Sequence, residues 1–338
     1  MKRSHLTKAR YSLGGTIPII YILLFAGVMG IIGTLALRWL KGPRVLEVVE
    51  YPMQEKLDIP TALAVAKDVT VWFTIDSSDA LGRIKDGKMQ RISKGSRNVE
   101  PLGIGVDAQG NAWVADAPAV AIKRVTPAGE ITATPLGTSI ARLGRLAMGP
   151  DDTVWFTEST AYSVTKLKDG ILTRHDIESL RGSPFGVAVA SDGTAWATLQ
   201  SSNTLLRIGT DATMTEHELP TRGAAPTDIA MDAKGRPWFI EFRGNKIGFL
   251  DEGKFTEYPV PMENAALSGI AVAPDGAVWF GMLRAHALGR VRDGKVEVLP
   301  FPREQARPFS LAADAAGNIW YADISGYVGM VPARAAQR

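Results

Sequence analysis

Two short apolar runs flank an Asp-Gly turn in the stretch Leu267-Ser268-Gly269-Ile270-Ala271-Val272-Ala273-Pro274-Asp275-Gly276-Ala277-Val278-Trp279-Phe280. Short runs bounded by Gly, Pro and Asp are typical of antiparallel strands joined by tight turns. The tryptophan of this stretch recurs at intervals of 41 or 42 residues. The series consists of Trp72, Trp113, Trp155, Trp196, Trp238, Trp279 and Trp320. A period near 40 residues indicates one supersecondary unit that is repeated along the chain.

Two further apolar runs complete the same repeat, Leu288-Gly289-Arg290-Val291 and Lys295-Val296-Glu297-Val298-Leu299-Pro300. Four short strands at this period form one blade of a β-propeller. The sequence therefore predicts an all-β protein, a seven-bladed β-propeller with one blade for each tryptophan of the series. We expect each tryptophan to lie on the second strand of its blade and to pack between neighbouring blades, because an aromatic side chain buries a large area there.

The two ends of the repeat region complement each other. Residues 327–332 match the third strand of the last blade, and no fourth strand follows them. Residues 45–52 resemble an outer strand such as residues 255–259. We expect residues 45–52 to close the ring as the missing strand, which protects an open sheet edge. Residues 45–332 would then form one closed propeller, followed by a C-terminal tail, residues 333–338.

A membrane anchor is predicted ahead of the propeller. Residues 17–37 contain no charged side chain over 21 positions, just long enough for a helix to cross a bilayer. The predicted segments are a basic tail (1–16), a transmembrane helix (17–40, with Trp39 at the interface) and a short linker (41–44). A cleaved signal peptide is the alternative, but its apolar core would be shorter and would end in small residues. The residues from Thr34 to Trp39 favour a retained anchor.

The basic flanks of the span suggest an orientation. Lys2, Arg3, Lys8 and Arg10 precede the span, and Arg38, Lys41 and Arg44 follow it. Four positive charges against three favour a cytoplasmic N-terminus and an external propeller. For a bacterial inner membrane protein, this orientation places the propeller in the periplasm.

Small side chains form a stripe along the predicted anchor. Ala26, Gly30 and Thr34 recur at four-residue spacing, with Gly27 and Gly33 beside them. Such a stripe allows another membrane helix to approach closely, which predicts an integral-membrane protein partner. The alternative is that glycine is simply frequent in membrane helices and that a single span needs no partner.

Charge and composition exclude two functional classes. The chain has 38 basic and 35 acidic residues, but seven basic and no acidic residues precede Val45. The propeller therefore holds 31 basic and 35 acidic residues, a net charge of −4, and the basic excess belongs to the membrane flanks, where it meets the lipid bilayer. A nucleic-acid-binding surface would show a basic stripe with interleaved aromatic residues, and the sequence contains none. The absence of cysteine excludes thiol chemistry.

The repeated sequence pattern of the blades resembles that of the virginiamycin B lyase (streptogramin lyase) family. The resemblance rests on segments such as residues 150–158 and 274–280 and spans all seven blades, about residues 58–332. It implies a histidine eleven residues before the tryptophan in two successive blades, both facing the central channel. It also implies a Glu-Pro pair before the second histidine, and a glutamate three residues past the tryptophan that helps to hold magnesium. Such a base would open a cyclic ester by elimination while the metal polarises the carbonyl.

This chain departs from that pattern. The two histidine positions that match best by spacing are Phe185 and Thr227, the glutamate before Pro226 is replaced by Ala225, and only Glu241 is kept. Across the blades the histidine position is occupied by Thr61, Leu102, Gly144, Phe185, Thr227, Ser268 and Phe309. The four histidines of the chain are expected elsewhere, in the tail (His5), in outer strands (His175 and His217) and in a loop (His286). The sequence thus predicts a propeller without the acid–base apparatus of the lyases.

Carboxylates three residues past the tryptophan are candidates for a metal site. They are Asp116, Glu158, Glu241 and Asp323. If they face the channel mouth, they would suit a hard cation such as Mg²⁺ or Ca²⁺. The alternative is that they cap turns or pair with Arg142, Arg145, Arg243 or Arg307, and their spread over non-adjacent blades favours this alternative. A Glu-Pro pair, Glu100-Pro101, occurs without a following histidine.

Two functions remain open from the sequence. The first is a membrane-anchored, non-catalytic interaction or scaffold module, an accessory subunit of a respiratory, photosynthetic or secretory membrane complex. The second is an enzyme, either a divergent metal-dependent lyase or a lactonase-like hydrolase. The absent histidines favour the first function, and the remaining acids leave the second open.

Overall fold

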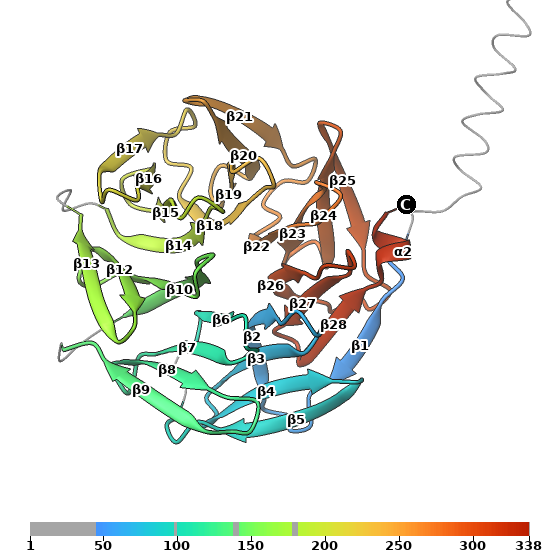
Figure 1. Ribbon diagram of the computed structural model, residues 1–338. Helices are drawn as coiled ribbons and strands as arrows, with labels where there is room; N and C mark the ends of the chain where they lie inside the picture. The colour runs from blue at the N-terminus through green and yellow to red at the C-terminus, as the bar shows by residue number, and fades with distance from the viewer. Residues whose placement is uncertain (1–44, 98–99, 138–141, 178–181, 338) are drawn as a thin grey trace, which may run out of the picture. The chain divides into compact units, whose positions relative to one another are not determined.

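Seven four-stranded antiparallel sheets surround a central axis in the computed structural model, which describes residues 45–97, 100–137, 142–177 and 182–337. Figure 1 shows the sheets side by side as the blades of a ring. The predicted seven-bladed β-propeller is confirmed. Each blade tryptophan lies on the second strand of its sheet, as the period predicts.

Each blade uses four strands in chain order from the axis outward, and the last blade borrows its outer strand from the N-terminal side. Blades 1 to 3 consist of β2 Ile59–Val65, β3 Val71–Asp76, β4 Ala80–Lys85 and β5 Lys88–Ser93; β6 Ile104–Val106, β7 Ala112–Asp116, β8 Ala121–Val125 and β9 Ile131–Pro135; and β10 Leu143–Met148, β11 Val154–Glu158, β12 Ser163–Lys168 and β13 Ile171–Asp176. Blades 4 to 6 consist of β14 Pro184–Val189, β15 Ala195–Leu199, β16 Thr204–Ile208 and β17 Met214–Glu218; β18 Pro226–Met231, β19 Pro237–Glu241, β20 Lys246–Asp251 and β21 Lys254–Pro259; and β22 Leu267–Val272, β23 Val278–Met282, β24 Ala287–Arg292 and β25 Lys295–Pro300. Blade 7 consists of β26 Pro308–Ala313, β27 Ile319–Asp323, β28 Tyr327–Val331 and β1 Val49–Pro52.

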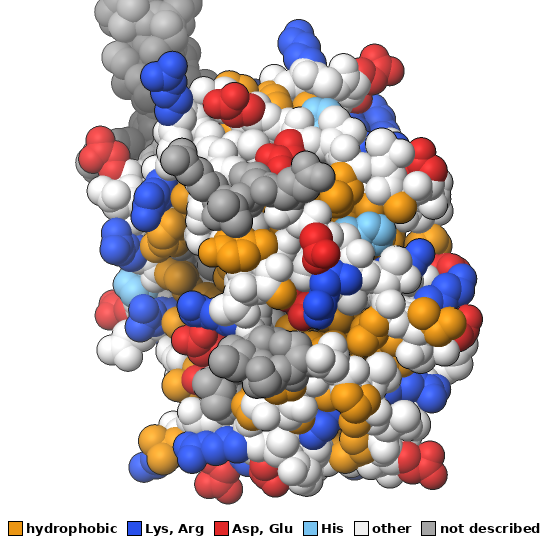
Figure 2. Space-filling model, turned by 90° about the vertical axis from the view of Figure 1, so that its left-hand side faces the viewer, with side chains coloured by type: hydrophobic (Ala, Val, Ile, Leu, Met, Phe, Trp, Pro, Cys, Tyr) orange, Lys and Arg blue, Asp and Glu red, His pale blue; other side chains and the backbone are white. Residues whose placement is uncertain are grey.

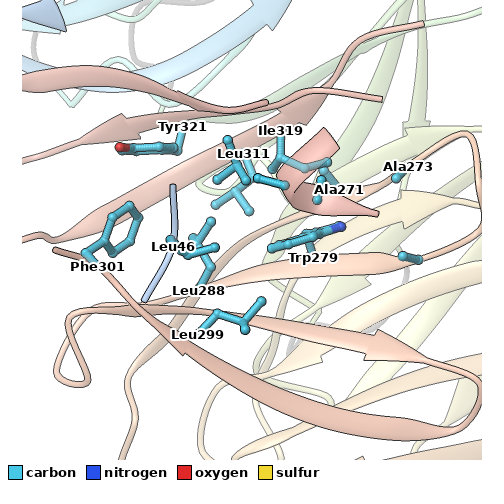
Figure 3. Close-up of a cluster of buried hydrophobic side chains, with 14 of the residues drawn as sticks. Leu46, Ala271, Ala273, Trp279, Leu288, Leu299, Phe301, Leu311, Ile319 and Tyr321 are labelled. Atoms are coloured by element: carbon cyan, nitrogen blue, oxygen red, sulfur yellow. The ribbon is translucent and has the colours of Figure 1, made fainter. Parts of the chain in front are cut away.

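The hydrophobic core is divided among the contacts between neighbouring blades. In one cluster Trp279 of blade 6 packs with Leu311 and Ile319 of blade 7, and Figure 3 shows these side chains facing one another. Trp320 of blade 7 packs in the same way with residues of blade 1, including Phe73. Each blade is therefore stabilised mainly by the next one, so the ring must close to bury every tryptophan.

The glycine of the third strand has a packing role. Phe73 follows the blade tryptophan, and its ring lies against Gly82, where an added Cβ would stand only 1.9 Å from a ring carbon. Gly289 faces Phe280 in the same manner, at 2.0 Å. Such distances are far inside van der Waals contact, so the recurring Ile-Gly or Leu-Gly sequence reflects this close approach.

The ring closes through the N-terminal segment. β1 pairs antiparallel with β28, with Val49 opposite Met330 and Tyr51 opposite Val328. Leu46 is buried, donates its backbone N–H to the Pro300 carbonyl at 3.0 Å, and packs in the cluster between blades 6 and 7 (Figure 3). This is the arrangement predicted for residues 45–52, with regular strand geometry beginning only at Val49.

The residues predicted as a C-terminal tail are not a free tail. Ala333–Ala336 form a short helix, α2, and Ala335 and Ala336 are buried in the same cluster as Leu46. Arg334 forms an ion pair with Glu47, which ties the two ends of the propeller together.

The predicted anchor, its helix-contact stripe and the linker fall within residues 1–44, outside the described residues. Among the residues that the structure describes, no helix is long and apolar enough to span a bilayer.

Candidate functional site

The innermost strands carry a local irregularity that selects the channel residues. In β10, β14 and β18 the pairing register shifts between the residues at positions 143 and 146, 184 and 187, and 226 and 229. Each shift includes the residue eleven positions before the blade tryptophan. A β-bulge redirects side chains and is common beside functional sites. Here it places Phe185, Thr227 and Arg145 at the central channel.

A cavity of about 180 Å³ lies at the channel mouth. Its lining is mostly apolar and comes from Phe185, Phe242, Leu267, Leu283 and Phe309, together with Arg145, Thr227, Asp228, Ser268 and Gln200. The two positions at which the resemblance implies histidines, Phe185 and Thr227, therefore do meet in one pocket, as expected. A phenyl ring and a threonine hydroxyl offer no base near neutral pH.

Arg145 bridges several blades at the pocket. Its guanidinium comes from blade 3 and pairs with the Asp228 carboxylate of blade 5 at 3.3 Å, while donating to the Leu102 carbonyl of blade 2 at 3.2 Å. The same group stands 5.9 Å from the ring centroid of Phe185 and 5.7 Å from that of Phe309. Only 8% of Arg145 is exposed. One side chain thus links blades 2, 4, 5 and 7 to its own.

A sequence signal for this pair exists in the residue ten positions before each tryptophan. Those residues are Ala62, Gly103, Arg145, Gly186, Asp228, Gly269 and Ser310. Five are small, and the two exceptions carry opposite charges. Arg145 is one of the arginines suggested as a partner for the carboxylates at the ends of the second strands, but it pairs with Asp228 instead.

The four candidate metal ligands are buried at the ends of the second strands of four different blades. Asp116 pairs with Lys94 at 2.7 Å and with Lys123 at 2.9 Å. Burial alone would raise the pKa of Asp116, but hydrogen bonds from Lys94, Ser96 and Lys123 outweigh it and hold that pKa below its usual value.

Two more of these carboxylates also have cationic partners. Glu158 pairs with Arg174 at 3.1 Å, and Asp323 pairs with Arg303 and accepts the backbone N–H of Arg307 at 2.9 Å. The structure does not bring the four together. No group of three or more His, Asp or Glu side chains that would hold a metal ion occurs in the described part of the chain.

Glu241 is the exception among the four. It is fully buried, and neither of its carboxylate oxygens has a hydrogen-bond partner. Where blade 3 places Arg174 opposite the third strand, blade 5 places a second carboxylate, Glu257, which pairs with Lys246 at 2.6 Å. Burial first, and then the negative charge of Glu257, raise the pKa of Glu241 to about 8.

Glu241→Gln is expected to remove a pH dependence of stability. The folded protein holds a proton on Glu241 that the unfolded chain releases near pH 4.5, so this stabilisation is lost as pH rises from about 4.5 to 8. We expect the variant and the parent to unfold alike at pH 5, and the variant to be more stable by on the order of 3 kcal/mol at pH 9. Urea denaturation at both pH values measures this difference.

Glu158→Gln is the matched control for that prediction. It breaks the ion pair with Arg174 and should lower stability at pH 9, the opposite sign. Equal pH profiles for Glu241→Gln and the parent would show that Glu241 is ionised in the folded protein at neutral pH.

The histidines in the described residues serve packing. His175 stacks on Trp155 and His217 lies against Trp196, each with ring centroids 5.5 Å apart. Burial lowers the pKa of both imidazoles. His286 lies in a turn, with Nδ1 2.9 Å from the Ala306 carbonyl. All three lie where the sequence predicts, outside the channel pocket.

Comparison with known proteins gives one family. The virginiamycin B lyase family model matches residues 44–207 and 192–335. Virginiamycin B lyase of Nocardia farcinica is 34% identical over 210 residues, which are 62% of this chain and 70% of that protein.

Solved structures share the fold. A streptogramin B lyase superimposes with a TM-score of 0.80 at 24% identity, covering 84% of this chain and 97% of its own. A catalytically inactive virginiamycin B lyase of Staphylococcus aureus, solved with quinupristin, gives 0.79 at 24% identity, covering 84% and 98%. YCF48 bound to a D1 peptide gives 0.68 at 13% identity, covering 86% and 99%. At these identities the likeness shows the fold alone.

Proposed function

This chain belongs to the virginiamycin B lyase family, and we propose that it is a non-catalytic member that acts as an interaction module. The observation that carries the proposal is the chemistry of the channel pocket. Phe185 and Thr227 stand where the resemblance implies two histidines, and Ala225 stands where it implies a glutamate. General-base assistance typically contributes about 10²- to 10⁴-fold to a rate, and these side chains offer none.

The contacts of Arg145 support the same proposal. Its charge is compensated by Asp228, so the pocket floor is held by an ion pair that links five blades. A floor of this kind favours a rigid docking surface over a site that must admit and activate a substrate.

We propose further that the disc is held at a bacterial inner membrane by residues 17–37, with the N-terminus in the cytoplasm and the propeller in the periplasm. Its partner would be an integral-membrane protein complex, respiratory, photosynthetic or secretory, of which this chain is an accessory subunit. The uncharged span and the small-residue stripe at Ala26, Gly30 and Thr34 support this part of the proposal.

An enzymatic role, as a divergent metal-dependent lyase or lactonase-like hydrolase, is the second candidate. One observation favours it. Glu241 is kept at the position of the glutamate that the resemblance implies, and its pKa is raised to about 8, a value suited to proton transfer near neutral pH. Against it stands the burial of Glu241 outside the channel pocket.

Purification from mildly solubilised membranes tests the proposal. We expect the full chain to co-purify with a stoichiometric integral-membrane partner. Gly30→Leu should keep the protein folded and membrane-bound but lower this recovery severalfold, because close packing drives helix association in lipid. Val28→Leu is the matched control, since at 100° per residue Val28 would lie on the opposite side of the helix.

Two results would contradict the proposal. Recovery of no partner from any preparation would remove the subunit role, and equal recovery of both variants would remove the helix contact. Opening of quinupristin by the purified protein, abolished in Glu241→Gln, would establish the enzymatic alternative.

A further inference from the structure

The channel mouth exposes apolar side chains that the fold does not cover. Phe242 is 44% exposed, and Leu283 occupies the equivalent position in the next blade, four residues past the tryptophan. Both line the same cavity as Phe185 and Phe309, which are half-buried. Grouped exposed apolar side chains in a rimmed pocket mark an interaction site more often than scattered ones do.

Three exposed arginines lie close in the chain to residues that line this pocket. Arg243 and Arg284 directly follow Phe242 and Leu283, and Arg307 stands two residues before Phe309. Among the described residues, no carboxylate lies within ion-pair distance of these three guanidinium groups. The loops of blades 5 and 6 that carry two of them are fixed, because the backbone N–H of Arg243 donates to the Ala224 carbonyl at 2.9 Å and that of Arg284 to the Ala265 carbonyl at 3.1 Å.

The loops around the pocket in blades 5 to 7 differ from the whole propeller in the sign of their charge. The whole propeller has a net charge of −4. The loops around the pocket in blades 5 to 7 instead carry four exposed arginines, Arg222, Arg243, Arg284 and Arg307, against the exposed Glu263 and Glu304. Figure 2 shows a side of the ring, where positive and negative side chains are interspersed with apolar ones.

We propose that the channel mouth binds an acidic segment of a partner protein, which inserts one bulky apolar side chain into the pocket while its carboxylates pair with Arg243, Arg284 and Arg307. This inference rests on the proposed interaction function and names the chemistry of the partner. A buried apolar anchor surrounded by a polar rim is the usual energetic plan of a protein interface.

The size and floor of the pocket support this occupant. Pockets for drug-sized ligands typically measure about 300–1,000 Å³, so a cavity of about 180 Å³ suits a single side chain. The floor carries the Arg145–Asp228 ion pair, whose charges compensate each other, so the selection for negative charge comes from the rim. A concave pocket also distinguishes a peptide from a flat lipid surface.

Selection of peptides on the full-length protein in detergent tests the proposal. The probe is a random dodecapeptide display library. We expect the selected sequences to share an aromatic or large aliphatic residue flanked by Asp or Glu. Binding of a selected synthetic peptide should weaken about tenfold or more in Phe242→Glu and in the double variant Arg243→Glu/Arg284→Glu.

The matched control is the double variant Lys254→Glu/Lys295→Glu. It makes the same charge change in the same two blades, at the exposed starts of β21 and β25. We expect the peptide affinity of this control to equal that of the parent. All these positions are exposed, so unchanged melting curves should show that every variant is folded.

Three results would overturn the proposal. They are selected peptides without acidic residues, equal loss of affinity in the control, and binding to vesicles of anionic lipid that matches peptide binding. Recovery of the partner complex distinguishes failure of this docking surface from failure of the proposed subunit role. If the complex is still recovered with Phe242→Glu and Arg243→Glu/Arg284→Glu, the docking surface is wrong and the subunit role stands. If no complex is recovered with the parent, the subunit role is wrong. The peptide selection then decides by itself whether the channel mouth is a docking surface.

Discussion

Arg145→Ala is expected to lower the free energy of unfolding by about 3–5 kcal/mol, the usual cost of removing one partner of a buried ion pair. The substitution leaves the Asp228 carboxylate without its cation and the Leu102 carbonyl without its donor. It also removes the contacts of the guanidinium with two phenyl rings. Since these partners belong to blades 2, 4, 5 and 7, the loss should weaken the whole ring. Urea denaturation followed by tryptophan fluorescence measures it.

Arg142→Ala is the matched control for this prediction. Arg142 lies three residues before Arg145 and pairs with Glu100 at the surface, where the two side chains are 70% and 63% exposed. Exposed pairs contribute about 0–1 kcal/mol, so the control should change little. Adding Asp228→Asn to Arg145→Ala should recover part of the loss, because it removes the uncompensated charge. Equal stability of Arg145→Ala and Arg142→Ala would show that the channel bridge contributes nothing.

The fold could be predicted because its driving force repeats. Each blade buries its tryptophan against the next blade, so a spacing of 41 or 42 residues specifies the number of blades. The closing strand was predictable for a related reason, since the last repeat lacks one strand and residues 45–52 resemble it. The positions of Phe185 and Thr227 in the channel also follow from their place within the repeat.

The contacts inside the channel and beneath it depend on differences between repeats. Arg145 and Asp228 lie in blades that are not neighbours, and a bulge in each inner strand brings their side chains together. The partners of the buried carboxylates vary in the same way. Asp116 of blade 2 pairs with Lys94, which follows the fourth strand of blade 1, whereas Glu158 pairs with Arg174 in the fourth strand of its own blade. A repeated pattern predicts the features that all blades have in common. These contacts differ from blade to blade, so the pattern does not predict them.

Deleting residues 45–52 from the full chain is expected to destabilise the whole propeller by on the order of 5 kcal/mol or more, or to prevent folding. The deletion removes β1 and exposes the edge of β28. It also leaves a hole where Leu46 packs between blades 6 and 7, and removal of a buried leucine side chain alone costs about 2–5 kcal/mol.

The same deletion disturbs the polar contacts that close the ring. Glu50 accepts hydrogen bonds from Arg303 at 2.9 Å and from the Tyr321 hydroxyl at 3.0 Å, so both donors lose an acceptor. Tyr51, which stacks against Trp320 at 6.3 Å, is lost as well. Because every blade depends on its neighbours, the first and last blades should unfold together with the rest in one transition.

Point variants keep this prediction testable if the truncated chain does not fold. Leu46→Ala should cost about 2–5 kcal/mol, whereas Val45→Ala, at a neighbouring side chain that is 51% exposed, should stay within about 0.5 kcal/mol of the parent. A synthetic peptide of residues 45–52 should raise the melting temperature of the truncated protein, because it supplies the missing strand. A truncated protein that unfolds at the parent's temperature would mean that three strands of blade 7 suffice. The ring would then be held by its inner strands and by Arg145, and the pairing of β1 with β28 would not be needed.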